Sequence, residues 1–93
     1  GRDVTGEEGL ALGLVTRIEA VPRAAAPAAA RDIAAKNPDA IRAAKRLLNA
    51  ATVSSPAEGL MMESVEQQAI LGSPNQVEAI AANMEKRAPR FAD

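Results

Sequence analysis

Residues 55–91 read SPAEGLMMESVEQQAILGSPNQVEAIAANMEKRAPRF, and this stretch contains two helix starts of the same design. Each start is a serine followed by proline, and the third position after the serine is Glu58 in one and Gln76 in the other. The serine side chain can cap the first turn, proline fits the first helical position, and the acid or amide completes a capping box. The pattern predicts two consecutive helices.

The first of these helices is predicted to reach Leu71 and to end at Gly72. Its apolar residues form an arc wider than the ~100° stripe of an ordinary surface helix. The arc consists of Leu60, Met61, Val65, Ala69 and Leu71, and Met62 widens it. Ile70 lies near Glu63 and Glu66, on the side that we expect to face water. An arc this wide predicts contact with more than one neighbouring surface.

The second helix carries one clean apolar stripe, which consists of Val77, Ile80, Ala81 and Met84. Asn83 and Lys86 fall on the opposite half of the helix, three residues apart and therefore close together. We expect Pro89 to end this helix.

Two more helices are predicted upstream. Residues 37–39, Asn-Pro-Asp, are a strong start signal, after which Ile41, Ala44 and Leu48 share one face flanked by Leu47. The alanine-rich residues 24–36 predict another helix, which we expect to begin near Pro27 because proline is tolerated only in a first turn.

The N-terminal residues predict one short helix and one short strand. Thr5 and Glu8 have capping-box spacing, and Gly13 is placed to end the helix in a left-handed conformation. Residues 15–19 have the branched side chains of a strand, whose partners we expect outside this chain. The predicted fold class is therefore mainly α, with at most one short strand near the N-terminus.

Composition narrows the function. The 93 residues carry a net charge of -1 and a single aromatic side chain, Phe91, which disfavours nucleic-acid binding. The absence of Cys and His excludes thiolate chemistry and the commonest metal ligand, and the lack of Cys fits a cytoplasmic protein. No apolar run approaches the roughly 20 residues of a membrane span, and no signal peptide is visible.

The apolar residues offer little area for a core. Alanine makes up much of the apolar 47%, so the hydrophobic stabilisation per residue is small. We therefore expect help from self-association or from a missing remainder of the chain. Because the first residue is Gly1 rather than Met, we expect a processed end, an artificial start or a cut within a longer protein.

Two charged clusters could carry chemistry. Glu58, Glu63 and Glu66 offer carboxylates for general acid–base work, although a solvated acidic face is the preferred interpretation. The basic cluster of Lys86, Arg87 and Arg90 could anchor an anion such as phosphate. The preferred interpretation is a set of charges that stabilise the helix end. The sequence shows no phosphate loop, nucleophile–base pair or metal constellation, so we predict no metal ligand.

Three segments together resemble the C-terminal third of the enoyl-CoA hydratase/isomerase (crotonase) family. They are GRDVTGEEGLALGLVTRI (1–18), AAKNPDAIRAAKRLLNAA (34–51) and SPNQVEAIAANMEKRAPRFAD (73–93). The resemblance implies that residues 1–22 are the last αβ turn of a spiral core. It implies that residues 23–93 form a helical region that builds a trimer and covers a neighbour's active site.

The activity that the resemblance implies is the processing of acyl-CoA thioesters, with coenzyme A as part of the substrate and no separate cofactor. In the family, oxyanion-hole amides and catalytic glutamates do this chemistry, and both precede the region that this chain resembles. We therefore assign no catalytic residue here and expect an upstream crotonase core as a partner. The alternative is a separately encoded helical interaction module without catalytic activity.

One binding role follows from the resemblance. Lys86 falls at the position of a lysine that holds the CoA nucleotide in several family members. The neighbouring aromatic position is Asn83, which departs from the family pattern and offers no stacking surface. Arg87 and Phe91 also match the closing motif, where their expected role is to dock the tail.

Overall fold

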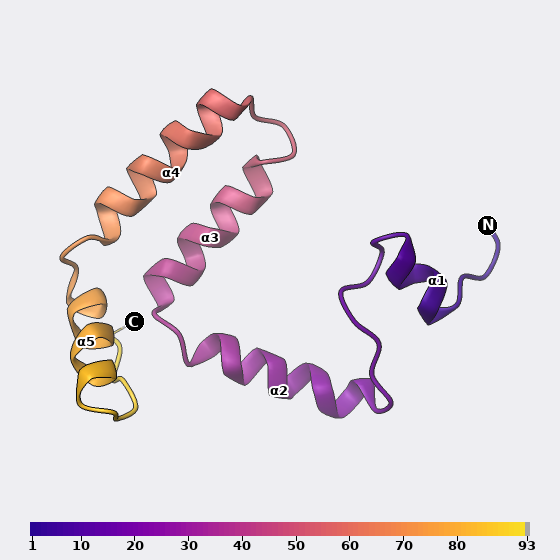
Figure 1. Ribbon diagram of the computed structural model, residues 1–93, viewed down its shortest axis with the longest axis horizontal. Coiled ribbons are helices and arrows are strands. Elements are labelled where there is room, and N and C mark those ends of the chain that lie inside the picture. Colours follow the sequence, from indigo (N-terminus) through magenta and orange to yellow (C-terminus); the bar gives the residue numbers. More distant parts are fainter. Residues whose placement is uncertain (93) are drawn as a thin grey trace. The chain divides into compact units, whose positions relative to one another are not determined.

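The computed structural model describes residues 1–92 and shows a mainly α-helical chain, with no strand among those residues (Figure 1). The helices are α1 (Gly6–Ala11), α2 (Pro22–Ala34), α3 (Pro38–Ala50), α4 (Pro56–Ile70) and α5 (Pro74–Met84). The chain divides into a first unit, Gly1–Arg31, and a second unit from Asp32 onward. The predicted fold class is confirmed at this level.

The predicted helix starts are confirmed by their caps. The side chains of Thr5, Asn37, Ser55 and Ser73 accept hydrogen bonds from the backbone N–H groups of Glu8, Asp39, Glu58 and Gln76, at 3.2, 2.9, 3.3 and 3.3 Å. At α4 the capping box is complete, because Glu58 Oε2 accepts from the Ser55 N–H at 2.8 Å. Each cap satisfies an amide that has no partner within its own helix.

Glycine ends α1 as predicted. Gly13 has a φ of 72°, and the turn around it closes with Leu14 N–H donating to Gly9 O at 2.8 Å. Gly13 N–H donates to Leu10 O at 3.1 Å. The two bonds together complete a Schellman motif. Gly72, with a φ of 76°, likewise follows the end of α4.

The start predicted for the second helix was wrong, whereas the strand expected at residues 15–19 stays a prediction because its partners were expected outside this chain. α2 begins at Pro22, and Pro27 lies inside it, since the alanines on both sides favour the helix enough to tolerate one missing N–H donor. Residues 15–19 form no strand, because a strand needs a ladder partner and no described residue supplies one. Val15 instead packs close to α1, where a Cβ on Gly9 would lie 3.6 Å from it.

Helices α3 and α4 run antiparallel, side by side, and form the main contact of the second unit (Figure 1). The residues of α3 that are buried within this chain are not the centre of the predicted apolar face. Ala43 is the buried residue and Leu47 is half-buried, whereas Leu48 is 71% exposed. Leu48 lines the edge of a hollow between α3 and α4 but stays mostly exposed.

The facing side of α4 also differs from the prediction. Ile70 was expected to face water, but it is half-buried and lies with Glu66 on the hollow between α3 and α4. Arg46 of α3 pairs with this acidic side of α4, since its guanidinium donates to both Glu66 oxygens at 2.6 Å. The predicted arc remains uncovered, with Leu60 and Met61 each 66% exposed.

Helix α5 shows the same reversal. Its buried residues are Asn75 and Ala82, while Val77, Ile80 and Met84 of the predicted stripe are exposed. The helix ends at Met84, so the prediction that Pro89 ends it was wrong; the tail beyond Met84 turns back along α5.

Candidate functional site

The turn after α5 carries the lysine that the sequence singled out. Arg87 N–H donates to Ala82 O, and Lys86 N–H donates to Asn83 O. This pair of bonds is the Schellman pattern, in which glycine usually takes the left-handed position. Lys86 takes that position here, with a φ of 52°. Lys86 therefore lies just beyond the helix rather than on it, and both Lys86 and Asn83 are exposed.

Arg87, in contrast, is held by acidic partners. Its Nη1 and Nη2 donate to the two Glu78 oxygens at 2.5 and 3.0 Å, and its Nε donates to Glu85 at 2.5 Å. The Arg90 backbone N–H donates to Glu78 Oε1 at 2.7 Å. The hydrogen bonds from Arg87 and then from the Arg90 N–H lower the pKa of Glu78 to about 2. The hydrogen bonds to Glu78 and then to Glu85 raise the pKa of Arg87. With two carboxylates beside it, Arg87 is a poor anchor for a free anion.

Asn75 is a buried side chain that sequence reasoning missed. Its Nδ2 donates to Asp39 Oδ2 and to Ala92 O, and its Oδ1 accepts from Ala92 N–H, each at 2.9 Å. One amide thus joins α5 to the start of α3 and to the chain's tail. No local sequence pattern signals this role, because the cap of α5 uses the side chain of Ser73 and does not involve Asn75.

Two of the three carboxylates in the predicted acidic group, those of Glu58 and Glu66, are engaged in structural contacts. Glu58 is engaged in the cap of α4, and hydrogen bonds from Ser55 lower its pKa. Glu66 is paired with Arg46, whose hydrogen bonds lower the pKa of that carboxyl. A general acid at neutral pH needs a raised pKa, and both shifts have the opposite sign.

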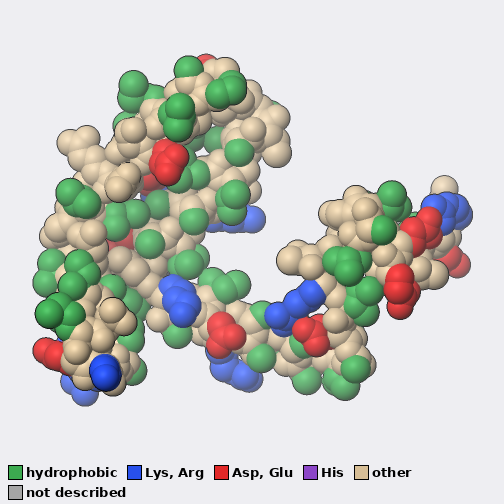
Figure 2. Space-filling view, viewed as in Figure 1, with side chains coloured by type: hydrophobic (Ala, Val, Ile, Leu, Met, Phe, Trp, Pro, Cys, Tyr) green, Lys and Arg blue, Asp and Glu red, His purple; other side chains and the backbone are tan. Residues whose placement is uncertain are grey.

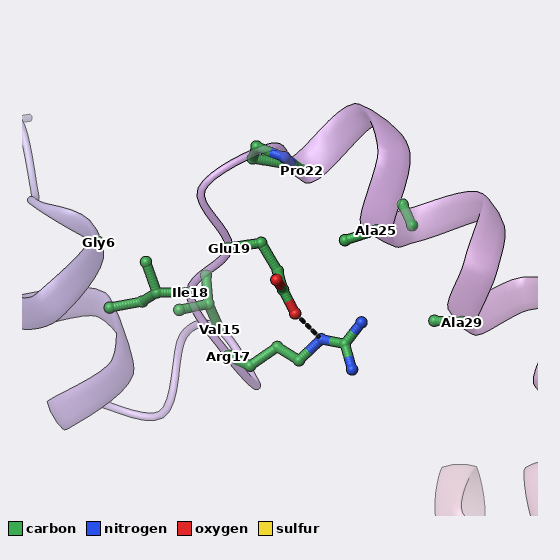
Figure 3. Close-up of a pocket in the computed structure, with 9 residues that line it drawn as sticks. Gly6, Val15, Arg17, Ile18, Glu19, Pro22, Ala25 and Ala29 are labelled. Atoms are coloured by element: carbon green, nitrogen blue, oxygen red, sulfur yellow. Dashed lines mark ion pairs between the residues drawn. The ribbon is translucent and has the colours of Figure 1, made fainter.

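The first unit contains an open apolar hollow of about 440 Å³, which Figure 3 shows in close-up. Its lining is almost entirely apolar or small: Gly6, Val15, Ile18, Pro22, Ala25, Ala26 and Ala29. The charged lining residues are Arg17 and Glu19, which neutralise each other through a 2.9 Å ion pair (Figure 3). The hollow therefore suits an uncharged apolar group.

A large part of the molecule's apolar surface is uncovered. Figure 2 shows hydrophobic side chains along the visible side of α4, and the chain exposes 7591 Å² in all. Two separate globular units with the lengths of these two would together expose only about 6,000 Å². Among residues 1–92, the buried apolar side chains are two alanines, Ala43 and Ala82.

The chain matches no family model, and a search of the curated proteins gives no match. Across residues 1–92, the helices are too short or too polar to traverse a lipid bilayer.

Proposed function

We propose that this chain is the C-terminal helical part of an enoyl-CoA hydratase/isomerase family protein that acts on acyl-CoA thioesters. Its role is to associate subunits, as a trimer, and to cover an active site whose catalytic residues lie upstream. The observation that carries the proposal is the uncovered apolar surface, since leucines and methionines exposed along whole helix faces belong against another surface. The sequence resemblance supplies the identity of that surface.

The first unit supports the same arrangement. Val15 and Ile18 line the 440 Å³ hollow from a segment without regular secondary structure, and their side chains lie against Gly9 and Gly6 of α1. An upstream strand pairing with residues 15–19 would cover this hollow and restore the last αβ turn, residues 1–22, of a crotonase-like core. The helical region of residues 23–93 would follow, in a cytoplasmic protein that binds neither nucleic acid nor membrane.

Lys86 is the proposed contact for the CoA nucleotide. An exposed lysine in a left-handed conformation is a backbone outlier, and such outliers cluster at functional sites. In the proposed oligomer, Lys86→Ala should raise KM for acyl-CoA several-fold and leave kcat nearly unchanged. The reason is that the lost contact stabilises the bound substrate and the transition state equally. The effect should shrink with salt, whereas Asn83→Phe should tighten CoA binding by restoring a stacking surface.

The deciding experiment is to sequence the gene upstream of the Gly1 codon and to assay the longer product with a short enoyl-CoA. Turnover by that product, together with an upstream oxyanion-hole segment, supports the proposal. The 93-residue chain alone should show no turnover above buffer. A reading frame that starts here, or a longer product without turnover, would instead favour the alternative of a non-catalytic helical interaction module.

A further inference from the structure

The turn at residues 85–87, the Lys86 turn, is held by the two residues that flank the lysine. Glu85 and Arg87 lie directly before and after Lys86, and Arg87 Nε donates to Glu85 Oε2 at 2.5 Å. Lys86 itself has a φ of 52°, a conformation that costs energy for a residue with a Cβ. Among the described residues, none forms an ion pair with the Lys86 ammonium. The backbone conformation of the lysine is therefore imposed by its neighbours.

Glu78 of α5 fastens this turn to the helix. Its two carboxylate oxygens accept from Arg87 Nη1 and Nη2 at 2.5 and 3.0 Å, and Oε1 also accepts from the Arg90 backbone N–H at 2.7 Å. A guanidinium bound to both oxygens of one carboxylate is fixed in orientation as well as in position. The chain that follows Lys86 is therefore attached to α5 at two points, Arg87 and Arg90.

Glu85 is attached to the same arginine but cannot fasten the turn. Its side chain is 61% exposed, and its one printed bond joins it to Arg87, within the turn itself. The side chain of Glu78 is 23% exposed and accepts three hydrogen bonds. The two carboxylates carry the same charge and share Arg87 as a partner, but Glu78 alone of the two connects the turn to α5.

The fastened turn affects how Lys86 can bind an anion. Arg87 is neutralised by two carboxylates, which leaves the exposed lysine as the cation of this turn. A lysine on a fixed backbone has fewer conformations to lose on binding than one on a mobile tail, so the ordering cost of binding is smaller. A group that holds the backbone in place thus strengthens binding without contacting the ligand.

We propose that Glu78 is a positioning residue for Lys86. Through Arg87 and the Arg90 N–H, it holds the turn in the conformation from which Lys86 meets a phosphate of the CoA nucleotide. The inference rests on the CoA contact proposed above for Lys86 and adds the residue that prepares it. Because Glu78 acts on binding and not on the reacting atoms, its loss should change KM and leave kcat nearly unchanged.

Nitrogen-15 relaxation of the 93-residue chain tests the positioning without any ligand. The order parameter of the Lys86 N–H should be about 0.85 in the unsubstituted chain and below about 0.6 in Glu78→Gln. The glutamine keeps the shape but replaces one acceptor oxygen with an NH2 donor, which cannot bind the guanidinium. Glu85→Gln is the matched control and should leave Lys86 ordered. The amide of Ile80, within α5, should stay ordered in both variants.

The longer gene product tests the consequence for the substrate. Glu78→Gln should raise KM for a short enoyl-CoA by no more than Lys86→Ala does, with kcat nearly unchanged. Glu85→Gln should not raise KM, because loss of a negative charge beside the lysine does not weaken the attraction for phosphate. In the double variant of Glu78→Gln and Lys86→Ala, KM should equal that of Lys86→Ala alone, since no lysine remains to be positioned.

An ordered Lys86 in Glu78→Gln, or a mobile one in the unsubstituted chain, would overturn the positioning role. The same follows if Lys86→Ala raises KM but Glu78→Gln does not, or if the two effects add in the double variant. An unchanged KM in Lys86→Ala, or a longer product without turnover, would instead overturn the proposed CoA contact. The relaxation result still decides whether Glu78 holds the turn, so the two proposals can fail separately.

Discussion

At the residue scale, the sequence predicts what acts locally and misses what acts at a distance. Every cap that was predicted joins atoms two or three residues apart, such as Ser55 and Glu58. Asn75 bonds to Asp39, 36 residues away, and to Ala92, 17 residues away. No periodicity encodes such pairs, so the buried amide that joins α3, α5 and the tail was not foreseen.

Lys86 gives a prediction about backbone strain. A left-handed conformation costs a non-glycine residue about 1–2 kcal/mol. Replacement by glycine removes this cost, but glycine's extra freedom in the unfolded chain offsets part of the gain in stability. Lys86→Gly should therefore raise the free energy of unfolding by up to about 1 kcal/mol in urea titrations. Lys86→Ala keeps the Cβ and should be close to neutral. Equal stabilisation by both variants would mean that the lysine's charge, not its backbone, is the unfavourable feature.

Glu78 gives a prediction about pH. Its pKa falls from 4.5 to about 2 on folding, so its pairing with Arg87 and Arg90 stabilises the chain above pH 4.5. That stability should be lost as pH falls from about 4.5 to about 2. Unfolding of Glu78→Gln should lack this pH-dependent component between about pH 5 and about pH 2, as followed by circular dichroism. Identical pH profiles for the two proteins would show that the tail contact contributes nothing.

At the element scale, apolar periodicity located the helices, but it did not show which faces pack within this chain. The pattern was weighted by large side chains, whereas the observed contacts use small ones, Ala43 on α3 and Ala82 on α5. On α4 the pattern had no single answer, because both sides are apolar. The Arg46–Glu66 ion pair lies on the side of α4 that packs against α3, and it joins two helices whose pairing the sequence does not reveal.

The register of α3 can be tested by overpacking at Ala43, which is buried. Ala43→Leu inserts three carbons there and should lower the free energy of unfolding by about 1–3 kcal/mol. The control position is Ala69, which is exposed within α4. Ala69→Leu should change the free energy of unfolding by less than about 0.5 kcal/mol, as surface substitutions usually do. Denaturant titrations of both variants measure the difference, and similar values for the two would place the predicted arc, not Ala43, in the core.

At the scale of the whole molecule, a mainly α fold could be predicted, but the distribution of stability could not. Both buried apolar side chains of the described residues, Ala43 and Ala82, lie in the second unit. The first unit has Gly9 as its buried residue and an open hollow beside it. The composition indicated that the hydrophobic core would be small. Only the packing shows that the first unit is the one without a core of buried apolar side chains.

The two units should consequently differ in amide hydrogen exchange. Helix α1 has six residues, and its stability comes mainly from the Thr5 cap and the Gly13 turn. Isolated helices shorter than ~12–15 residues are at best marginally stable in water. The free energy of opening should therefore be about 0 kcal/mol for the amides of α1. For the amides of α3 beside the α3–α4 contact, it should approach the free energy of global unfolding. Exchange followed by mass spectrometry separates peptides covering α1 from those covering α3.

Ala43→Leu provides the internal control, since it should accelerate exchange in α3 and leave exchange in α1 unchanged. Equal protection of both helices would mean that the first unit is stabilised by more than its caps and its own few apolar contacts.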